Sequence, residues 1–407
     1  MARETSDSNM AGLSQTPSAG RVHISFFGKR NAGKSSLVNA VTGQSLSIVS
    51  DVKGTTTDPV SKAMELLPLG PVVIIDTPGL DDEGALGEKR VEKTYQILAK
   101  TDIAVLVIDA QHGLSAEDRD LLALLEKKRI PYITVLNKTD LLAVDPDSKA
   151  LDIPTLAVSA ATGDGITELK EKIAQLGKTA APQKQLIGDK LKKNEVVILV
   201  TPIDESAPKG RLILPQVQTL RDILDTHAVS MVTQVPELSA CLSALKEPPA
   251  LVVTDSQAFH QVKEIVPRSV PLTSFSILMA RFKGILEMAS KGAHYLPHLS
   301  DGDKVLISEG CTHHRQCEDI GTVKLPGWIE KFTGKKLDFH FTSGGEFPRD
   351  LSPYALVVHC GGCMLNEREM LSRMELARQA GVPFTNYGTL IAHINGILDR
   401  SLEIFHE

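Results

Sequence analysis

The sequence lacks several features, and each absence excludes a class of protein. Aromatic residues make up only 4% of the 407 residues, which leaves little material for stacking single-stranded nucleic acid. The apolar runs are far shorter than the ~20 residues that cross a bilayer, so we expect no membrane segment. Neither sign of charge dominates: the formal net charge is -6, which argues against a chain devoted to nucleic-acid backbone binding.

The first 20 residues lack both an apolar core and a basic start. They are rich in Ser, Thr and Ala, so we expect a disordered tail and no signal peptide. We therefore expect a cytoplasmic protein whose thiols are reduced. The chain has only 5 cysteines, and four of them lie in its last quarter, so they need an explanation other than disulfides.

A chain of 407 residues is expected to hold about two to three domains. Over residues 21–176, short apolar runs alternate with helical patterns, which predicts a doubly wound α/β domain. Residues 177–188 are rich in Pro, Gly and Lys and form the predicted linker. A second βα series, residues 189–275, contains no cluster of catalytic residue types. The third region, residues 276–407, starts with a long predicted helix, and no internal repeat is obvious.

Apolar runs locate the expected strands, and the fold class is α/β throughout. Strands of the first domain are predicted at 22–27, 72–76, 103–109, 132–137 and 155–159. Later strands are predicted at 196–202, 229–235, 250–256, 304–310 and 355–359, and a helix is predicted at 217–226.

Residues 28–35 (GKRNAGKS) match the phosphate-binding loop, between a predicted strand and a predicted helix. Glycines allow backbone N–H groups to face phosphate oxygens, and the helix N-terminus adds positive partial charge. Lys34 can reach the β and γ phosphates, and Ser35 can offer its hydroxyl to Mg²⁺. The predicted phosphate-binding residues are Gly28, Asn31, Ala32, Gly33, Lys34, Ser35 and Ser36.

Two further segments complete the predicted magnesium site. Asp76 ends a predicted strand, where its carboxylate can hold a magnesium-bound water and the N–H of Gly79 can bind the γ phosphate. Residues 53–58 (KGTTTD) offer hydroxyls to complete the magnesium shell, and we favour Thr56 over Thr55. The predicted magnesium ligands are therefore Ser35, Thr56 and Asp76.

Guanine recognition is predicted from residues 137–140 (NKTD), at the end of the fourth strand. Asp140 can accept hydrogen bonds from guanine N1–H and N2–H₂, which adenine cannot supply. GTP is therefore preferred over ATP. The predicted base-binding residues are Asn137, Lys138, Asp140, Ser159 and Ala160, the last two after the fifth strand.

The order of these motifs resembles the GTPases related to MnmE and Era. In that group an Asn at the position of Asn31 helps to hold a potassium ion, so the resemblance implies K⁺-stimulated GTP hydrolysis. It implies Lys34, Asn31 and Thr56 as catalytic residues. Leu80 stands where Ras-type enzymes carry a catalytic Gln, which agrees because an apolar residue cannot orient water. The alternative is a slow switch in which Asn31 only caps a turn.

Cysteines follow two predicted strands of the third region: Cys311 after 304–310 and Cys360 after 355–359. If both strands lie in one parallel sheet, their carboxyl ends face one crevice. Cys363 adds a second thiol at CxxC spacing, with two glycines between. Spacing alone leaves open an iron–sulfur cluster, zinc, a redox dithiol and plain core packing. The nearby histidines are His313, His314 and His359.

Residues 311–313 (CTH) and 359–363 (HCGGC) resemble the signature of HydF, a family of FeFe-hydrogenase maturation GTPases, and the likeness covers residues 21–407. The resemblance implies that Cys311, Cys360 and Cys363 hold a 4Fe-4S cluster, and it leaves His313 and His359 open as a fourth ligand. It implies a homodimer formed by the middle domain and a scaffold that delivers a diiron precursor. The implied partners are radical-SAM maturation proteins and the apo FeFe-hydrogenase, with no nucleic acid and no membrane.

Two other functions compete with a maturation scaffold. One is a tRNA- or ribosome-directed GTPase with zinc in the cysteine site, against which the acidic balance counts. The other is a redox-sensing switch whose cluster controls GTP turnover. For the scaffold, we expect nucleotide state to change the loops at residues 55–58 and 76–82 and so to regulate partner docking.

Overall fold

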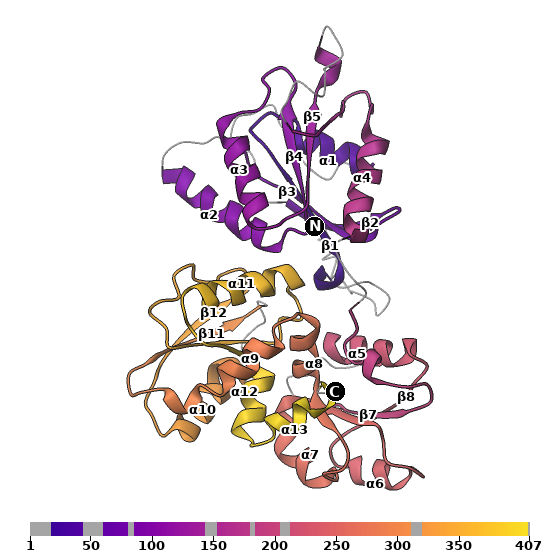
Figure 1. Ribbon diagram of the computed structural model, residues 1–407, viewed down its shortest axis with the longest axis vertical. Helices are drawn as coiled ribbons and strands as arrows, with labels where there is room; N and C mark the ends of the chain where they lie inside the picture. The colour runs from indigo at the N-terminus through magenta and orange to yellow at the C-terminus, as the bar shows by residue number, and fades with distance from the viewer. Residues whose placement is uncertain are drawn as a thin grey trace, which may run out of the picture. The chain divides into compact units, whose positions relative to one another are not determined.

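The computed structural model of the protein describes residues 18–43, 60–79, 85–142, 153–179, 184–203, 212–310 and 320–405. The chain divides into two compact units, Met1–Ala180 and Ala181–Glu407 (Figure 1). Both units are mixed α/β structures, as predicted. Among the helices described, none is long and apolar enough to cross a membrane.

The first unit is built on a six-stranded sheet in the order β2-β3-β1-β4-β5-β6. All strands are parallel except β2, which runs antiparallel to β3. The predicted doubly wound domain is confirmed. The strands are β1 (Val22–Phe27), β2 (Val60–Leu66), β3 (Gly70–Asp76), β4 (Ile103–Asp109), β5 (Tyr132–Asn137) and β6 (Thr155–Ala157), and the helices are α1 (Lys34–Thr42), α2 (Ala85–Lys100), α3 (Ala116–Lys127) and α4 (Ile166–Thr179).

Each face of this sheet packs on its own pair of helices, α1 and α4 on one side and α2 and α3 on the other (Figure 1). On β4, Val105 packs in the core that contains Leu37 of α1, and its neighbour Leu106 packs in the core that contains Leu98 of α2. Successive strand side chains point to opposite faces, so a strand covered on both faces reads as one apolar run. This is why the central strands could be predicted.

Strand β2 was missed because it is an edge strand with little buried surface. Of its seven residues only Leu66 is buried, so the apolar signal of a central strand is absent. The other expected strands of this unit are present, with two changes of bounds. Strand β3 begins two residues before the predicted 72–76, and β6 ends two residues before the end of the predicted 155–159.

The second unit contains two four-stranded parallel sheets, in the orders β10-β9-β7-β8 and β12-β11-β13-β14. The strands are β7 (Val196–Val200), β8 (Val229–Thr233), β9 (Leu251–Thr254), β10 (Leu272–Ser274), β11 (Lys304–Glu309), β12 (Asp338–Ser343), β13 (Leu356–His359) and β14 (Phe384–Asn386). The helices include α5 (Leu214–Asp225), α6 (Leu238–Ser243), α7 (Phe259–Ile265), α10 (Leu325–Thr333), α11 (Glu367–Gln379) and α13 (Leu398–Leu402).

These two sheets have the same topology and register. In each, the first strand in the chain lies between the second and the third, and the fourth is at the edge. We call residues 196–282 the first half and residues 304–394 the second half. No repeat is obvious in the sequence, but the structure contains one. The shared segment, ALVV at residues 250–253 and 355–358, is too short to stand out from other apolar runs.

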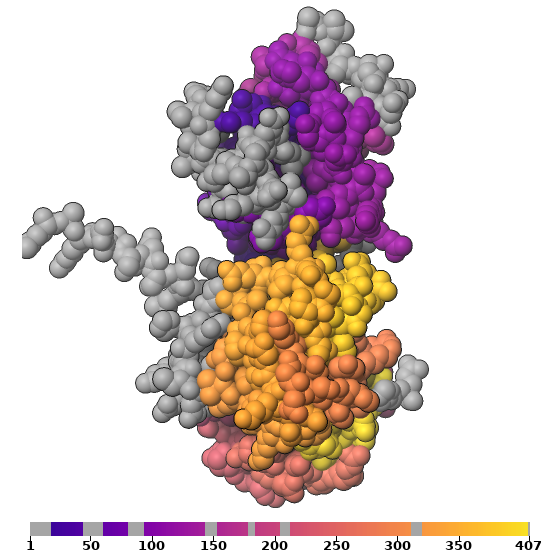
Figure 2. All heavy atoms as spheres, turned by 90° about the vertical axis from the view of Figure 1, so that its left-hand side faces the viewer, coloured from indigo at the N-terminus to yellow at the C-terminus, as the bar shows by residue number. Residues whose placement is uncertain are grey.

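Both halves contribute to one hydrophobic core, in which Val252 of the first half and Val358 of the second are fully buried. In Figure 2 the facing surface of the second unit is formed mainly by the second half, in orange, with the first half, in salmon, along its base.

The long helix predicted from residue 276 is two helices, α8 (Phe275–Phe282) and α9 (Leu286–Ala293). Gly284 separates them because its φ of 73° ends the helical path.

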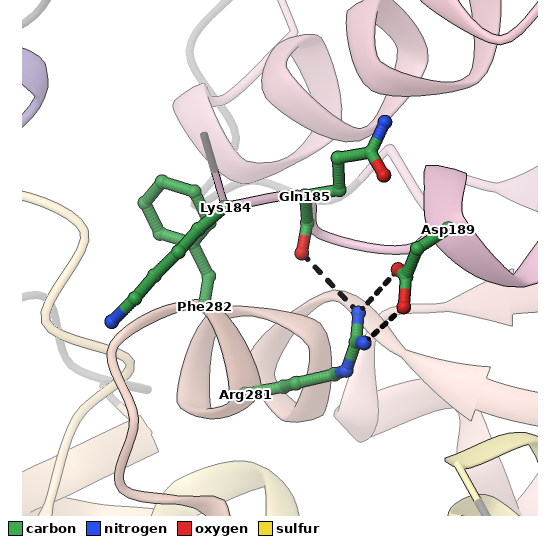
Figure 3. A pocket seen from close by; sticks show the side chains of 5 residues that line it. All are labelled: Lys184, Gln185, Asp189, Arg281 and Phe282. Atoms are coloured by element: carbon green, nitrogen blue, oxygen red, sulfur yellow. Dashed lines mark hydrogen bonds and ion pairs between the residues drawn. The ribbon is translucent and has the colours of Figure 1, made fainter. Parts of the chain in front are cut away.

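Arg281, on α8, is hydrogen-bonded to residues near the start of the second unit. Its guanidinium donates to both carboxylate oxygens of Asp189, at 2.8 and 2.5 Å, and to the backbone oxygen of Gln185 at 3.2 Å (Figure 3). These bonds hold the pKa of Asp189 below its ordinary value. The end of the predicted linker, residues 177–188, is therefore hydrogen-bonded to α8. The predicted domain boundaries stay predictions. Lys184, Gln185, Asp189, Arg281 and Phe282 line an open pocket of about 260 Å³.

Candidate functional site

The phosphate loop connects β1 to α1 and depends on two glycines. Gly28 and Gly33 have φ values of 143° and 88°, a region that side chains disfavour. A Cβ on Gly28 would lie 2.2 Å from the carbonyl oxygen of Val107, and one on Gly33 would lie 2.3 Å from Asn137 Nδ2. Only glycine fits both places, so the sequence motif has a steric reason in this fold.

The ammonium of Lys34 is held at the centre of this loop. Lys34 is buried, and its Nζ donates to the carbonyl oxygens of Gly28 at 3.0 Å and Lys29 at 2.7 Å. Asn31 has a φ of 59°, so the loop carries a non-glycine residue in the left-handed region. The lysine ammonium therefore lies inside the loop that the motif predicts to bind phosphate, and its role there stays a prediction.

Ser35 and Asp76 form a pair suited to magnesium. The Ser35 hydroxyl donates to Asp76 Oδ2 at 2.6 Å, so the two predicted ligands are adjacent. Asp76 is 3% exposed, and its Oδ1 is buried without a hydrogen-bond partner among the described residues. A buried, unsatisfied carboxylate oxygen beside a hydroxyl is a donor set that Mg²⁺ prefers. The residues present therefore fit the ion.

The residues predicted to recognise guanine are hydrogen-bonded to the phosphate loop. Asn137 Nδ2 donates to the Ala32 carbonyl at 3.0 Å, and Asn137 Oδ1 accepts from the Ala160 N–H at 3.1 Å. The Ser159 hydroxyl donates to Asp140 Oδ1 at 2.6 Å, which orients the carboxylate that is predicted to read guanine. Residues from three loops, far apart in the sequence, are thus brought together as predicted.

Asp109 was not predicted and supports this site from the end of β4. Lys138 Nζ donates to Asp109 Oδ2 at 2.7 Å. Burial raises the pKa of Asp109, but hydrogen bonds from Lys138 and from the Gln111 N–H outweigh it, and the pKa is lowered overall. An acidic residue at the end of a central strand is the signal that could have identified it.

Several predicted residues lie outside the described part of the chain. They include the two threonines of residues 53–58 that were predicted as magnesium ligands, and two residues of the 76–82 loop. They also include one of the three predicted cluster cysteines and the two histidines that follow it. Their predicted roles stay predictions. These residues are Thr55, Thr56, Leu80, Asp82, Cys311, His313 and His314.

Cys360 and Cys363 begin the loop after β13, at the carboxyl end of the second sheet. The Cys360 sulfur accepts hydrogen bonds from the N–H groups of Gly310, at 3.1 Å, and Gly362, at 3.4 Å. Gly310 is the residue before Cys311, so the described backbone that leads to the first cysteine motif contacts Cys360 of the second. Gly362 has a φ of 62°, which lets the loop turn back toward the sulfur.

Cys363 is held as a thiol in this environment. Burial raises its pKa to about 11, the nearby Cys360 adds to the rise, and Lys283 opposes it. Lys283 is 1% exposed and donates to the Leu365 carbonyl at 2.6 Å. Two thiols at CxxC spacing, with amides directed at sulfur and a buried cation nearby, fit an iron–sulfur centre chemically. The described residues contain no group of three or more metal-ligating side chains, and Cys311 is not among them.

Comparison with known families divides the chain into three parts. Residues 23–138 match the family described as 50S ribosome-binding GTPase. Residues 186–284 match the hydrogen maturase F dimerization domain, and residues 287–404 match the hydrogen maturase F tetramerization domain. The three matches follow the order of the GTPase motifs and the two sheet-containing halves.

Individual relatives match only part of the chain. The tRNA modification GTPase MnmE of Nitrosomonas europaea is 36% identical over 170 residues, which cover 41% of this chain and 37% of that protein. GTPase Der of Kosmotoga olearia is 36% identical over 166 residues, 37% of each protein. The chain thus spans little more than a third of the length of these relatives. A structure of Era bound to MgGDPNP and 16S ribosomal RNA has a TM-score of 0.36 at 20% identity and covers 53% of this chain and 94% of that one, a likeness too weak to carry an argument.

Proposed function

We propose that this chain, which belongs to the hydrogen maturase F family and carries a GTPase domain of the MnmE and Era type, is a GTP-hydrolysing scaffold for metallocluster assembly. Its family makes it a hydrogenase-maturation GTPase. The finer proposal is that Cys311, Cys360 and Cys363 hold a 4Fe-4S cluster, and that the protein receives and delivers the diiron precursor of the FeFe-hydrogenase active site.

The Cys360 sulfur carries this proposal. Two backbone N–H groups point at it, and one belongs to Gly310, which leads directly into Cys311. Amide hydrogen bonds to sulfur stabilise thiolate ligands and tune the clusters they hold. With three cysteines and a fourth position not assigned to cysteine, a cluster would keep one iron open to an exchangeable ligand, which suits a loading scaffold.

GTP hydrolysis rests on the residues of the first unit. Lys34 binds the phosphates, Ser35 and Asp76 are adjacent at 2.6 Å to hold Mg²⁺, and Asp140 reads guanine. Mg²⁺ held by Ser35 and Asp76 would supply positive charge beside the phosphates. We further propose that Asn31 contributes to a K⁺ site, so that replacing K⁺ by Na⁺ slows hydrolysis in the wild type and has little effect in Asn31→Ala.

Oligomers follow from the matched dimerization and tetramerization domains. A homodimer through the middle domain is the state we propose for the scaffold. Its proposed partners are radical-SAM maturation proteins, which supply the precursor, and the apo hydrogenase, which accepts it. Nucleotide state then regulates partner docking through the loops after the phosphate site.

Anaerobic reconstitution with iron and sulfide tests the cluster directly. Electron paramagnetic resonance of the reduced full-length protein is compared for wild type, Cys311→Ala, Cys360→Ala and Cys363→Ala. Cys241→Ala, in α6, is the matched control. We expect a 4Fe-4S signal that each of the three variants loses, while Cys241→Ala and GTP hydrolysis stay unchanged. A silent wild type that retains stoichiometric zinc would favour a tRNA- or ribosome-directed GTPase instead.

A further inference from the structure

A buried arginine contacts the strand that leads into the cysteine loop. Arg373, on α11, is 3% exposed. Its guanidinium donates to the Gly344 carbonyl at 2.6 Å and to Glu369 Oε1 at 2.7 Å, and it stacks 5.1 Å from the centre of the Phe347 ring. Burying a charge costs free energy unless the charge is paired and hydrogen-bonded. These partners therefore stabilise the buried guanidinium at this place.

The same guanidinium contacts His359, the histidine of the HCGGC motif. Arg373 Nη1 lies 3.0 Å from His359 Nε2. Because a guanidinium can only donate, Nε2 must be the acceptor, and the ring proton is on Nδ1. Nδ1 in turn donates to the Cys360 carbonyl at 2.9 Å. His359 is fully buried, and both of its ring nitrogens are occupied, so neither is available to iron in this arrangement.

This network joins the two strands that lead into the cysteine motifs. Ser308 of β11 and His359 of β13 are paired in register, and the Cys360 N–H donates to the Ser308 carbonyl at 2.9 Å. Arg373 Nη1 also donates to the Ser308 hydroxyl, at 3.4 Å. One side chain therefore contacts both strands at their last register pair, next to Cys360 and three residues before Cys311.

The first half shows that the fold itself does not need this network. At the corresponding register pair it has Val200 and Thr254. The hydroxyl of Thr254 is buried and has no hydrogen-bond partner among the described residues. The hydrogen-bonded Ser–His–Arg arrangement therefore occurs in the half that carries Cys360 and Cys363.

We propose that Arg373 and His359 are a positioning pair for the cysteine site. Arg373 fixes the histidine tautomer, and His359 holds the Cys360 carbonyl so that the sulfur faces the amides of Gly310 and Gly362. His359 is thus a positioning residue and not the fourth iron ligand. The inference rests on the proposed cluster function.

The test uses the full-length chain, reconstituted anaerobically. The variants are His359→Ala, Arg373→Gln and Arg373→Lys, and the matched control is Arg378→Gln, an exposed arginine on the same helix. Iron affinity, the midpoint potential of the cluster and the thermal midpoint of the metal-free protein are measured. Arg373→Lys keeps the buried charge, so it remains informative where Arg373→Gln fails to fold.

We expect the three variants, but not the control, to lower iron affinity by about tenfold and to shift the midpoint potential. The double variant His359→Ala/Arg373→Lys is expected to be no worse than the poorer single variant, because the two residues act as one unit. In pulsed paramagnetic resonance of protein with ¹⁵N-labelled histidine, no coupling of a directly bound His359 nitrogen is expected.

Two results would overturn the inference. One is a strong histidine nitrogen coupling that disappears only in His359→Ala, because it would make His359 a ligand. The other is unchanged iron affinity and potential in folded His359→Ala and Arg373→Lys. Both results require a wild type that binds the cluster. A wild type that binds none contradicts the proposed function itself, so the two failures are distinguishable.

Discussion

The two halves of the second unit share strand order and register, yet only one carries a candidate metal site. After equivalent strands, the first half has Asp255, Ser256, Gln257 and Ala258, and the second has residues 360–363 (CGGC). The backbone plan is therefore not what creates the site. Four loop residues and the charged network behind them make the difference, and function resides in such local sites and not in the fold.

Gly362 offers the strongest test of this comparison, because the loop can form only with a left-handed residue there. In Gly362→Ala the new Cβ would lie 2.5 Å from Met370 Sδ, and the left-handed backbone adds roughly 1–2 kcal/mol. We expect iron affinity after reconstitution to fall by about tenfold. Gln257→Ala, at the equivalent place in the first half, is the control and should bind iron like the wild type. Equal iron binding by both variants would contradict the prediction.

The contact between α8 and α12 (Tyr387–Ile394) is the second test, because different residues, Ser276 and Gly388, meet there from the two halves. A Cβ on Gly388 would lie 2.6 Å from the Cβ of Ser276, its equivalent in the first half. We expect Gly388→Ala to lower the free energy of unfolding by about 1–3 kcal/mol in urea titrations. Adding Ser276→Gly should recover part of the loss, since it removes the opposing Cβ. Simple additivity of the two changes would show that the contact is not limiting.

The helix caps after β10 and β14 should differ by a smaller amount. Ser274 Oγ accepts from the Ile277 N–H at 3.2 Å, whereas Asn386 accepts from the Thr389 N–H at 3.0 Å and also donates to the Ser276 carbonyl at 3.2 Å. We expect Asn386→Ala to cost about 1–2 kcal/mol and Ser274→Ala about 0.5–1 kcal/mol of unfolding free energy. Chemical denaturation of each variant measures this. The reverse order would mean that the bond between the halves contributes little.

The smallest expected effect is on the pH dependence of the protein's stability. It concerns His393, which occupies the helix position that Arg281 occupies in the first half. Burial, and then the charge of His294, lower the pKa of His393, while Asp399 opposes the shift. The unfolded chain therefore binds a proton at higher pH than the folded one, and stability falls as pH drops below the ordinary histidine pKa of about 6.5. The thermal midpoint between pH 7 and pH 5 should fall less in His393→Phe than in wild type. An identical pH profile would contradict the prediction.

Sequence alone predicted the nucleotide site because each of its motifs is a short contiguous segment. A phosphate loop is built from consecutive backbone N–H groups, so residues 28–35 must appear as one motif, and the NKTD segment is equally local. The central strands were also predictable, since burial on both faces requires an unbroken apolar run. The edge strand β2, whose side chains are mostly exposed, carried no such signal.

Tertiary structure alone decided the supporting groups of the cysteine site. Arg373 lies 14 residues from His359 and 65 residues from Ser308, and no spacing rule of a helix or strand relates the three. The close contact between Ser276 and Gly388 and the repeated strand order of the two sheets are likewise set by packing. Motifs record chemistry that neighbouring residues perform together, whereas a buried charge and its partners are brought together only by the folded chain.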